Sequence, residues 1–463
     1  MSRGSTAGRL RPRARRGQIQ SGLRSSGSGG ITAQARRPGR FGLGFGLALC
    51  AAVSAHGQLA PLPHDQGAVG LELALRRLGV TARVLYVTAH PDDENNAVLV
   101  RLSRGQGLRT GLLTLTRGDG GQNEIGPELF EALGVLRTGE LMAVHRYDAA
   151  EQFFTRAYEF GYSFSVEETF AKWGKEATLG DVVKAVRAFR PDVMLTLPLE
   201  GAGGGQHHQA AARLAVEAFR AAADPARFPE HARQGLRPWQ ARKIYRGGVG
   251  GGAPGAGGAP PVHVATGGLD PLLGMSPQEL GSLARASHRS QGTSQLRAGP
   301  GEGIGVFTLV DSEPGVKAPE ADLLDGVDVS VRGLARFARA GEPSAAGLEE
   351  ELAALQALAD AARDAFDARA PHKAAAPLAA YLARVREVGA RLQREGGRPD
   401  LIGRLADEEH DAAAALPLAA GLAFEVLSDD GDVVRGQSFT VTAAVANQGA
   451  AAVHLEAVSV RVP

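Results

Sequence analysis

The chain has 463 residues, of which 44% are hydrophobic and 22% charged, enough for a normal globular core and for two or three domains. The formal net charge of +1 hides an asymmetry, because residues 1–40 hold ten of the 51 basic residues and no acidic one. The remainder carries 41 basic against 50 acidic residues. A net acidic chain is poorly suited to a phosphate backbone, which argues against nucleic acid as a partner.

An uncharged apolar run, FGLGFGLALCAAVSA, occupies residues 41–55 directly after three arginines. It is too short to span a membrane, which needs about 20 residues, and is typical of a signal peptide with small residues at Val53–Ala55 for cleavage. We therefore predict a basic leader plus signal peptide over residues 1–57, a secreted or periplasmic protein, and no transmembrane segment in the mature chain. A buried core helix, or a lipid anchor at Cys50, is the alternative.

Cys50 is the only cysteine, and it lies in the segment predicted to be removed. The mature protein would then have no disulfide and no thiolate ligand. Any metal site must use His, Asp and Glu side chains.

From residue 82 onward, short β-rich runs alternate with stretches of helical period. Continuous apolar strands that alternate with helices predict a mainly parallel sheet covered on both faces, that is, a Rossmann-like three-layer α/β sandwich over residues 58–315. The expected strands are 83–89, 110–116 and 192–197, and the expected helices are 96–104, 128–147 and 209–222.

The rest of the chain changes character twice. Residues 247–260 are glycine-rich and predict a flexible loop. Residues 316–420 form a mainly helical region, with a helical hairpin over 348–393 that breaks near Ala370 and Pro371. Three alternating stretches at 424–427, 438–445 and 453–462 predict a partial immunoglobulin-like β segment over residues 421–463.

The strongest chemical feature is His90-Pro91-Asp92-Asp93-Glu94, at the carboxyl end of the first predicted strand. Ligands bind at that edge of open parallel sheets. Adjacent carboxylates repel one another, and a cation is the simplest means of keeping them ionised together. A helix start capped by Asp or Glu, with a hydrogen-bonded histidine beside it, is the alternative interpretation.

A second polar group follows the strand 192–197, where a glycine-rich loop leads to Gln206, His207 and His208 at the head of a helix. Two strand ends of one sheet can meet at one crevice. His90, Asp93 and His208 then form a His/Asp/His set with an open fourth position, as catalytic zinc requires, although such a set also accepts Fe(II) or Co(II). Asp92 is left beside the metal as a candidate general base.

At these residues the chain resembles the PIG-L (LmbE-like) zinc deacetylases, in their long secreted bacterial form, over roughly residues 83–291. The resemblance rests on AHPDDE at 89–94, TRGDGGQN at 116–123, RTGEL at 137–141 and HHQAA at 207–211. It implies that His90, Asp93 and His208 bind zinc, that Asp92 is the base, that Arg137 holds the substrate and that Glu159 contacts sugar hydroxyls. Further candidates for substrate binding are Gln122, Asn123 and Gln291, the last in a His-x-Ser-Gln element that begins at His288.

One residue departs from the family pattern. Many members have His-x-x-His at the third ligand, and this chain has Gly205 at the first of these positions. His207 and His288 are the candidates for the missing acid or oxyanion partner.

The predicted reaction is hydrolysis of the acetamide on an N-acetylglucosamine-type sugar or glycoconjugate. A zinc hydrolase of another amide or ester, and a secreted carbohydrate-binding protein with a vestigial deacetylase domain, are the rival hypotheses. Other polar residues favour structural interpretations. The glycines at 118, 120 and 121 lack phosphate-loop spacing and predict a tight turn, and Ser287 and Ser290 lack a G-x-S-x-G elbow.

Overall fold

The computed structural model describes residues 65–200, 205–247, 260–293, 298–314, 319–450 and 452–457. The predicted leader and signal peptide, Cys50 and most of the glycine-rich loop at 247–260 lie outside these residues. None of the helices within the described ranges is long and apolar enough to cross a membrane.

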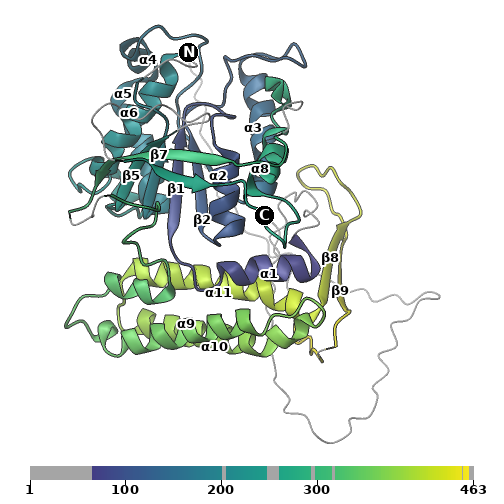
Figure 1. The fold of residues 1–463 in the computed structure, drawn as a ribbon. Helices are drawn as coiled ribbons and strands as arrows, with labels where there is room; N and C mark the ends of the chain where they lie inside the picture. The colour runs from purple at the N-terminus through teal and green to yellow at the C-terminus, as the bar shows by residue number, and fades with distance from the viewer. Residues whose placement is uncertain are drawn as a thin grey trace, which may run out of the picture. The chain divides into compact units, whose positions relative to one another are not determined.

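A seven-stranded sheet forms the centre of the fold (Figure 1). Its strand order is β3-β2-β1-β4-β5-β7-β6, in which the first five strands are parallel and β7 runs antiparallel to both β5 and β6. The mainly parallel sheet predicted from the apolar runs is therefore confirmed. The strands are β1 (Arg83–Thr88), β2 (Arg109–Thr114), β3 (Glu151–Phe154), β4 (Val193–Thr196), β5 (Lys243–Gly247), β6 (Val262–Ala265) and β7 (Ile304–Ser312).

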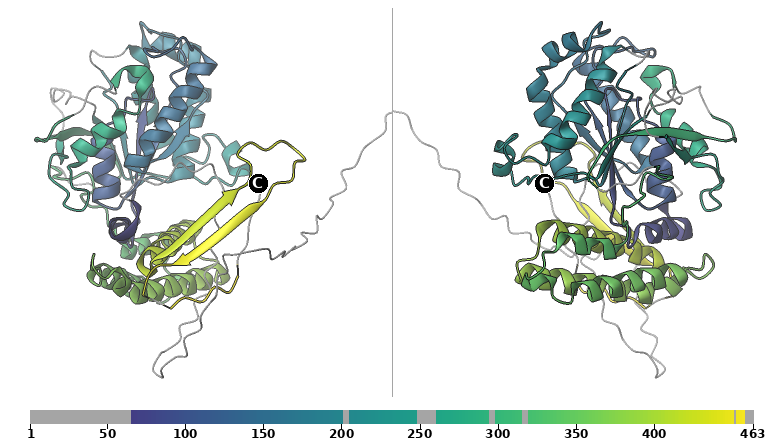
Figure 2. Two further views of the ribbon diagram at one scale, coloured as in Figure 1. Left: turned by 90° about the vertical axis from the view of Figure 1, so that its right-hand side faces the viewer. Right: turned by 60° about the vertical axis from the view of Figure 1, so that its left-hand side comes forward.

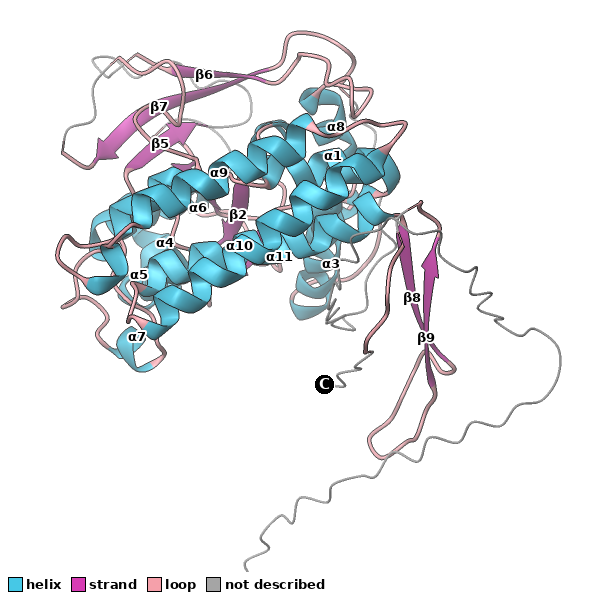
Figure 3. Cartoon of the chain, turned by 90° about the horizontal axis from the view of Figure 1, so that it is seen from below, coloured by secondary structure: helices cyan, strands magenta, loops and turns pink. Residues whose placement is uncertain are grey.

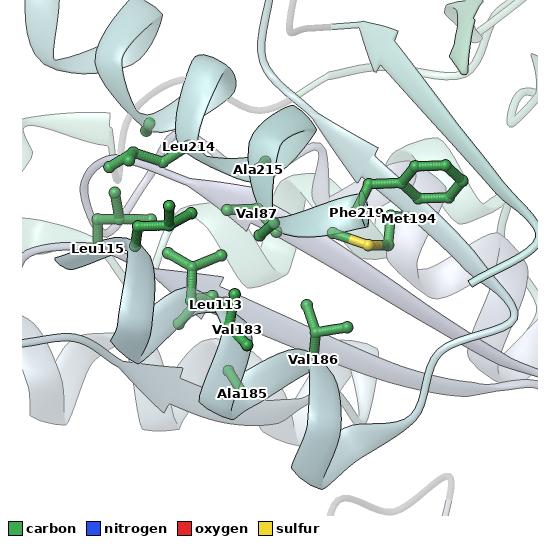
Figure 4. Close-up of a cluster of buried hydrophobic side chains, with 14 of the residues drawn as sticks. Val87, Leu113, Leu115, Val183, Ala185, Val186, Met194, Leu214, Ala215 and Phe219 are labelled. Atoms are coloured by element: carbon green, nitrogen blue, oxygen red, sulfur yellow. The ribbon is translucent and has the colours of Figure 1, made fainter. Parts of the chain in front are cut away.

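Helices cover both faces of the sheet, as the continuous apolar strands predict (Figure 2). Leu85 and Val87 of β1 belong to a buried cluster with residues of α4, α5 and α6 on one face, and Figure 4 shows part of this cluster, including Val87. Val84 and Tyr86 point to the other face, against α2, α3 and α8. These helices are α2 (Asn96–Val100, continued by a π-helical turn, Arg101–Gly105), α3 (Glu131–Asp148), α4 (Val166–Trp173), α5 (Lys175–Phe189), α6 (Gln206–Ala221) and α8 (Pro277–Arg285), and a short α7 (Glu230–Arg233) follows α6.

A further helical layer lies at the amino end of the strands (Figure 3). It consists of α1 (Gly67–Arg77), α9 (Leu348–Asp364), α10 (Ala375–Arg394) and α11 (Pro399–Ala420). The predicted hairpin corresponds to α9 and α10, which are separated by a 3₁₀ turn at Pro371–Ala374. Buried Glu408 of α11 accepts a hydrogen bond from the backbone N–H of Gly79 at 2.8 Å, just before β1. The division into domains at residues 316 and 421 stays a prediction.

After Gly421, the chain forms an antiparallel hairpin of β8 (Leu422–Ser428) and β9 (Val441–Asn447). Beyond the first residue of each strand, every residue of the hairpin strands is exposed. The third predicted strand, 453–462, does not form over its described part, 453–457, since a strand needs a hydrogen-bonded neighbour and these residues pair with none. An immunoglobulin-like sandwich stays a prediction.

Candidate active site

The order of the strands brings two polar loops to one point. β1 lies at the centre of the parallel strands, and the chain continues from it to β2 on one side before it returns to β4 on the other. Crevices outside the carboxyl ends of strands at such a reversal are where open α/β sheets bind ligands. Residues 90–94 follow β1 there, and α6 begins with Gln206, His207 and His208 after β4.

The structure brings together the three side chains predicted to bind metal. His90 Nδ1 lies 3.1 Å from His208 Nε2, His208 Nε2 lies 3.0 Å from Asp93 Oδ1, and His90 Nδ1 lies 3.4 Å from Asp93 Oδ2. Four-coordinate zinc, with bonds of about 2.0–2.1 Å, holds neighbouring ligand atoms roughly 3.3 Å apart. Asp93 faces His208 with Oδ1 and His90 with Oδ2, and one ligand atom from each of the three residues lies within 4.8 Å of the others. Two imidazoles and a carboxylate at this spacing fit a zinc-like divalent cation.

The carboxylate of Asp93 is oriented by its own loop. Its Oδ2 accepts hydrogen bonds from the backbone N–H groups of Ala89 and His90, at 3.1 and 2.7 Å. Burial alone would raise the pKa of Asp93, but the charges of His208 and His90 and their hydrogen bonds hold this pKa well below its usual range. Asp93 is thus an ionised ligand whose orientation is fixed in advance.

His207 lies at the other ring nitrogen of His90, where His90, His207 and Glu159 form a second group of side chains close enough to hold a metal ion. Its Nδ1 is 3.0 Å from Nε2 of His90, and its ring packs against Phe160 and Trp173. If Nδ1 of His90 binds a metal, Nε2 of His90 carries the hydrogen and donates it to His207, an arrangement common around metal ligands. Burial, together with the neighbouring histidines, lowers the pKa of His207 to about 3, so the ring is neutral. This geometry gives no support to the predicted role of His207 as an acid.

Asp92 lies next to the metal triangle with a partly exposed side chain. Burial, and the nearby charge of Asp93, raise its pKa to about 6. Its Oδ1 is 3.3 Å from Nη2 of Arg137. A carboxylate with a raised pKa at this edge of the sheet suits the role of general base.

Arg137 is buried between two carboxylates, with only 2% of its surface exposed. Besides Asp92, it contacts Oε2 of Glu159 at 3.4 Å and donates to the carbonyl oxygens of Gly118 and Pro91. Arg137 thus links the side chains of Asp92 and Glu159, and its contact with a substrate stays a prediction. Oε1 of Glu159 lies 4.0 Å from Nε2 of His90, on the side of His207.

The glycines after β2 allow this close packing. A Cβ at Gly118, where φ is +68°, would lie 2.2 Å from Nη1 of Arg137, and a Cβ at Gly120 would lie 2.2 Å from the carbonyl oxygen of Glu159. The run is therefore a tight turn against Arg137 and Glu159, as its spacing predicts.

The remaining predicted substrate residues hold loops together. Nε2 of Gln291 donates to the carbonyl oxygen of Gln122 at 2.6 Å, which ties the loop after β2 to the 3₁₀ turn Arg289–Gln291. The side chain of Asn123 accepts from the N–H of Gly126 and donates to the carbonyl oxygen of Glu128. Contact of these three side chains with a substrate stays a prediction.

His288 is fully buried, with Nε2 2.7 Å from Oε1 of Glu94. Glu94 is fully buried too, and burial would raise its pKa, but the charge of His288 and hydrogen bonds from His288 and Asn96 lower it to about 2. His288 is thus paired with Glu94, and its predicted role as an acid or oxyanion partner stays a prediction. No role was predicted for Glu94, although its place in the HPDDE motif was a signal. No role was predicted either for Arg285, whose Nη1 donates to the carbonyl oxygen of Asp92 and which lies far from the motif in sequence.

Comparison with known proteins identifies the part of the chain that carries this site. Residues 85–219 match the family model described as PIG-L: GlcNAc-PI de-N-acetylase. The match shows what this part of the chain is similar to. The match contains His90, Asp93, His208, Asp92 and Arg137 and ends before His288.

Two similar proteins are each named 1D-myo-inositol 2-acetamido-2-deoxy-alpha-D-glucopyranoside deacetylase, from Streptomyces avermitilis and Thermobispora bispora. Each is 32% identical over 181 residues, which is 35% of this chain and 60% and 58%, respectively, of the length of those proteins. The chain thus spans about three fifths of these relatives. Among solved structures, N,N'-diacetylchitobiose deacetylase from Pyrococcus horikoshii aligns at 17% identity and a TM-score of 0.35, over 48% of this chain and 83% of that one.

The departure from the family pattern at Gly205 has a physical reason. Gly205 precedes α6 with a φ of +74°, a conformation that side-chain-bearing residues rarely adopt. Space is not the limit, because a Cβ there would lie 3.6 Å from the nearest atoms, in ordinary contact with Ser163. The backbone at the head of α6, rather than crowding, therefore favours glycine at this position.

Proposed function

We propose that this chain is a zinc-dependent hydrolase that removes the acetyl group from an N-acetylglucosamine-type sugar or glycoconjugate. The observation that carries the proposal is the triangle of His90, Asp93 and His208 with Asp92 beside it. The names of the related proteins, which describe deacetylation of a 2-acetamido sugar, support the choice of substrate.

The three proposed ligands follow β1 and begin α6, and their closeness in the fold supports the proposal of a metal site. A divalent cation held there would supply Lewis acidity and lower the pKa of a coordinated water.

The chain's own residues handle the proton. Ionised Asp92 accepts a proton from the water that attacks the acetyl carbonyl carbon, and it returns this proton to the nitrogen as the C–N bond breaks. The products are acetate and the free amino sugar. Arg137 keeps the carboxylate of Asp92 in place during both transfers, since its Nη2 lies 3.3 Å from Oδ1 of Asp92.

The proposed location is outside the cytoplasm. It is supported by the apolar run 41–55 after the basic residues, which is typical of an export signal. Protein sequencing of the mature N-terminus after expression in a bacterial host would test it, and retention of residues 1–40 would contradict it.

Acetate release from a panel of N-acetyl sugars and glycoconjugates tests the activity. The purified chain is assayed with added Zn²⁺, with a chelator, and after reconstitution with Zn²⁺, Fe(II) or Co(II). We expect release that the chelator abolishes and that metal restores. A chain that neither retains nor regains metal would overturn the proposal and favour the carbohydrate-binding hypothesis.

A further inference from the structure

The backbone of Asp92 adopts an unusual conformation. Its φ is +99°, whereas the other four residues besides glycine with positive φ in the described ranges have values of +53° to +59°. Left-handed helical values of about +50° to +70° are the ones that side-chain-bearing residues tolerate best. Asp92 therefore lies outside the favoured region, and surrounding groups must hold it there.

Two charged side chains hold the two backbone polar groups of Asp92. Its N–H donates to Oε2 of Glu94 at 2.9 Å, and its carbonyl oxygen accepts from Nη1 of Arg285 at 2.6 Å. The other oxygen of Glu94, Oε1, accepts from Nε2 of His288 at 2.7 Å and from Nδ2 of Asn96 at 3.0 Å. We call Glu94, Arg285 and His288 the Asp92 clamp.

The clamp joins the metal loop to α8. Arg285 is the last residue of α8, and His288 lies just beyond it, with its N–H bonded to the carbonyl oxygen of Arg285 at 3.0 Å. α8 lies directly on the start of α2, because a Cβ at Gly281 would come within 2.5 Å of the backbone nitrogen of Ala97. The position of α8 therefore sets the position of the two basic side chains.

This arrangement has a consequence for the side chain of Asp92. With φ held and both backbone polar groups fixed, the direction of its Cα–Cβ bond is determined, and the carboxylate lies beside Arg137 and the metal triangle. If either backbone hydrogen bond is lost, the residue can relax toward a favoured φ and turn the carboxylate away. Displacement of a catalytic group by about 1 Å can cost two orders of magnitude in rate.

We propose that Glu94, Arg285 and His288 are positioning residues that act on the reaction through the backbone of Asp92. The proposal rests on the proposed function, in which Asp92 is the general base. It assigns a role to the last residue of the HPDDE motif and to two residues beyond the region that matches the family model.

The test uses Arg285, which is partly exposed, because loss of buried Glu94 can prevent folding. We expect Arg285→Met to lower kcat roughly 10- to 100-fold with KM, zinc content and Tm unchanged, since only the base is displaced. Arg285→Lys keeps a cationic donor and should recover most of this loss. Arg289→Met removes the same charge from an exposed position four residues away and should match the wild type.

A crystal structure of the zinc-loaded Arg285→Met variant is the second measurement. We expect φ of residue 92 to move from +99° toward the favoured region, with His90, Asp93 and His208 still on the metal. An unchanged kcat in an active enzyme, an unchanged φ, or a fall in kcat that accompanies loss of zinc and of Tm would each overturn the proposal. Absence of acetate release by the wild type would instead overturn the proposed function, and the φ of residue 92 would still decide the clamp.

Discussion

Both ends of the central sheet are rich in charged side chains, but the acidic and basic charges are matched at only one end. At the amino end, Asp192 accepts from Arg336 at 2.5 Å, from Arg404 at 3.2 Å and from the N–H of Arg83 at 2.8 Å. Nearby Asp407 and Asp411 pair with Arg83 and Arg109. Each carboxylate in this group faces at least one guanidinium, and the group ties the helical layer to the strands.

At the carboxyl end of the sheet, the acidic side chains outnumber the arginines that contact them. Asp92, Asp93, Glu94 and Glu159 lie close together, and among the residues that the structure describes, Arg137 and Arg285 are the permanent cations bonded to them. Ring nitrogens of His90 and His208 face each other at 3.1 Å, and Asp92 has an unfavourable backbone conformation. A high density of charged side chains therefore does not by itself indicate a reactive site. Incomplete pairing and a constrained backbone do, because they cost stability that a purely structural role would not require.

The largest expected effect comes from removing the anionic ligand. Asp93→Ala leaves two histidines, which cannot hold a catalytic metal by themselves, so we expect zinc content to fall from about one equivalent to near zero and activity to fall to background. Metal analysis of the purified variant, together with acetate release, measures both. Asp407→Ala at the other end of the sheet is the matched control and should keep its zinc. Retention of zinc by Asp93→Ala would remove this residue from the ligand set.

The second prediction distinguishes the proposed general base, Asp92, from the proposed metal ligands. Asp92→Asn keeps the size of the side chain but cannot accept the proton, so kcat should fall about 10²- to 10⁴-fold while zinc content stays unchanged. Single-turnover acetate release by the zinc-loaded variant is the measurement. Full activity would show that another group takes the proton.

The third prediction concerns Arg404, at the amino end of the sheet, where the charges are matched. Arg404 has 3% of its surface exposed, and Arg404→Met removes a charge from the buried cluster around Asp192. We expect a loss of about 3 kcal/mol in the free energy of unfolding, measured in urea, because one partner of a buried pair is left behind. The kcat of the folded variant should equal that of the wild type. A lowered kcat at unchanged stability would mean that the two ends are not independent.

The smallest expected effect is a dependence of folding stability on pH, which the pairing of His145 with Asp148 causes. Burial would lower the pKa of His145, but Asp148, at 2.8 Å from its Nδ1, raises it to about 9. Because the folded pKa lies above the ordinary value of about 6.5, the stabilisation is complete below pH 6.5 and is lost as pH rises through 9. Urea unfolding at pH 6 and pH 9.5 should show a loss of up to about 3 kcal/mol. His145→Gln should flatten this slope, and an equal slope in both proteins would contradict the assignment.

The sequence predicted the catalytic end of the sheet well, because the relevant signals are local. His90 and Asp93 lie in one motif after a strand, and His208 follows the next central strand, so topology alone brings them together. The choice of His208 over His207 as the ligand came from the family resemblance and stays a prediction, because neighbours on a helix project in different directions and both histidines lie close to His90.

What the sequence could not predict depends on pairs far apart along the chain. Glu94 and His288 are separated by 194 positions, and Arg285 and Asp92 by 193. The buried, neutral state of His207 depends on Trp173 and Phe160, from a loop and helix that carry no motif. The last helix of the amino-end layer, Pro399–Ala420, lies in the region predicted to be mainly helical, but its bounds were not predicted.

The ligand triangle also joins chain segments that are 118 positions apart, at His90 and His208. A cation bound there acts as a cross-link between the loops that follow β1 and β4, and it is lost when the chain unfolds. Metal affinity and folding stability are therefore thermodynamically linked, and free zinc at 100 times its dissociation constant adds about 2.7 kcal/mol to the free energy of unfolding. A chelator would then act on this protein twice, as an inhibitor of its reaction and as a mild denaturant of its fold.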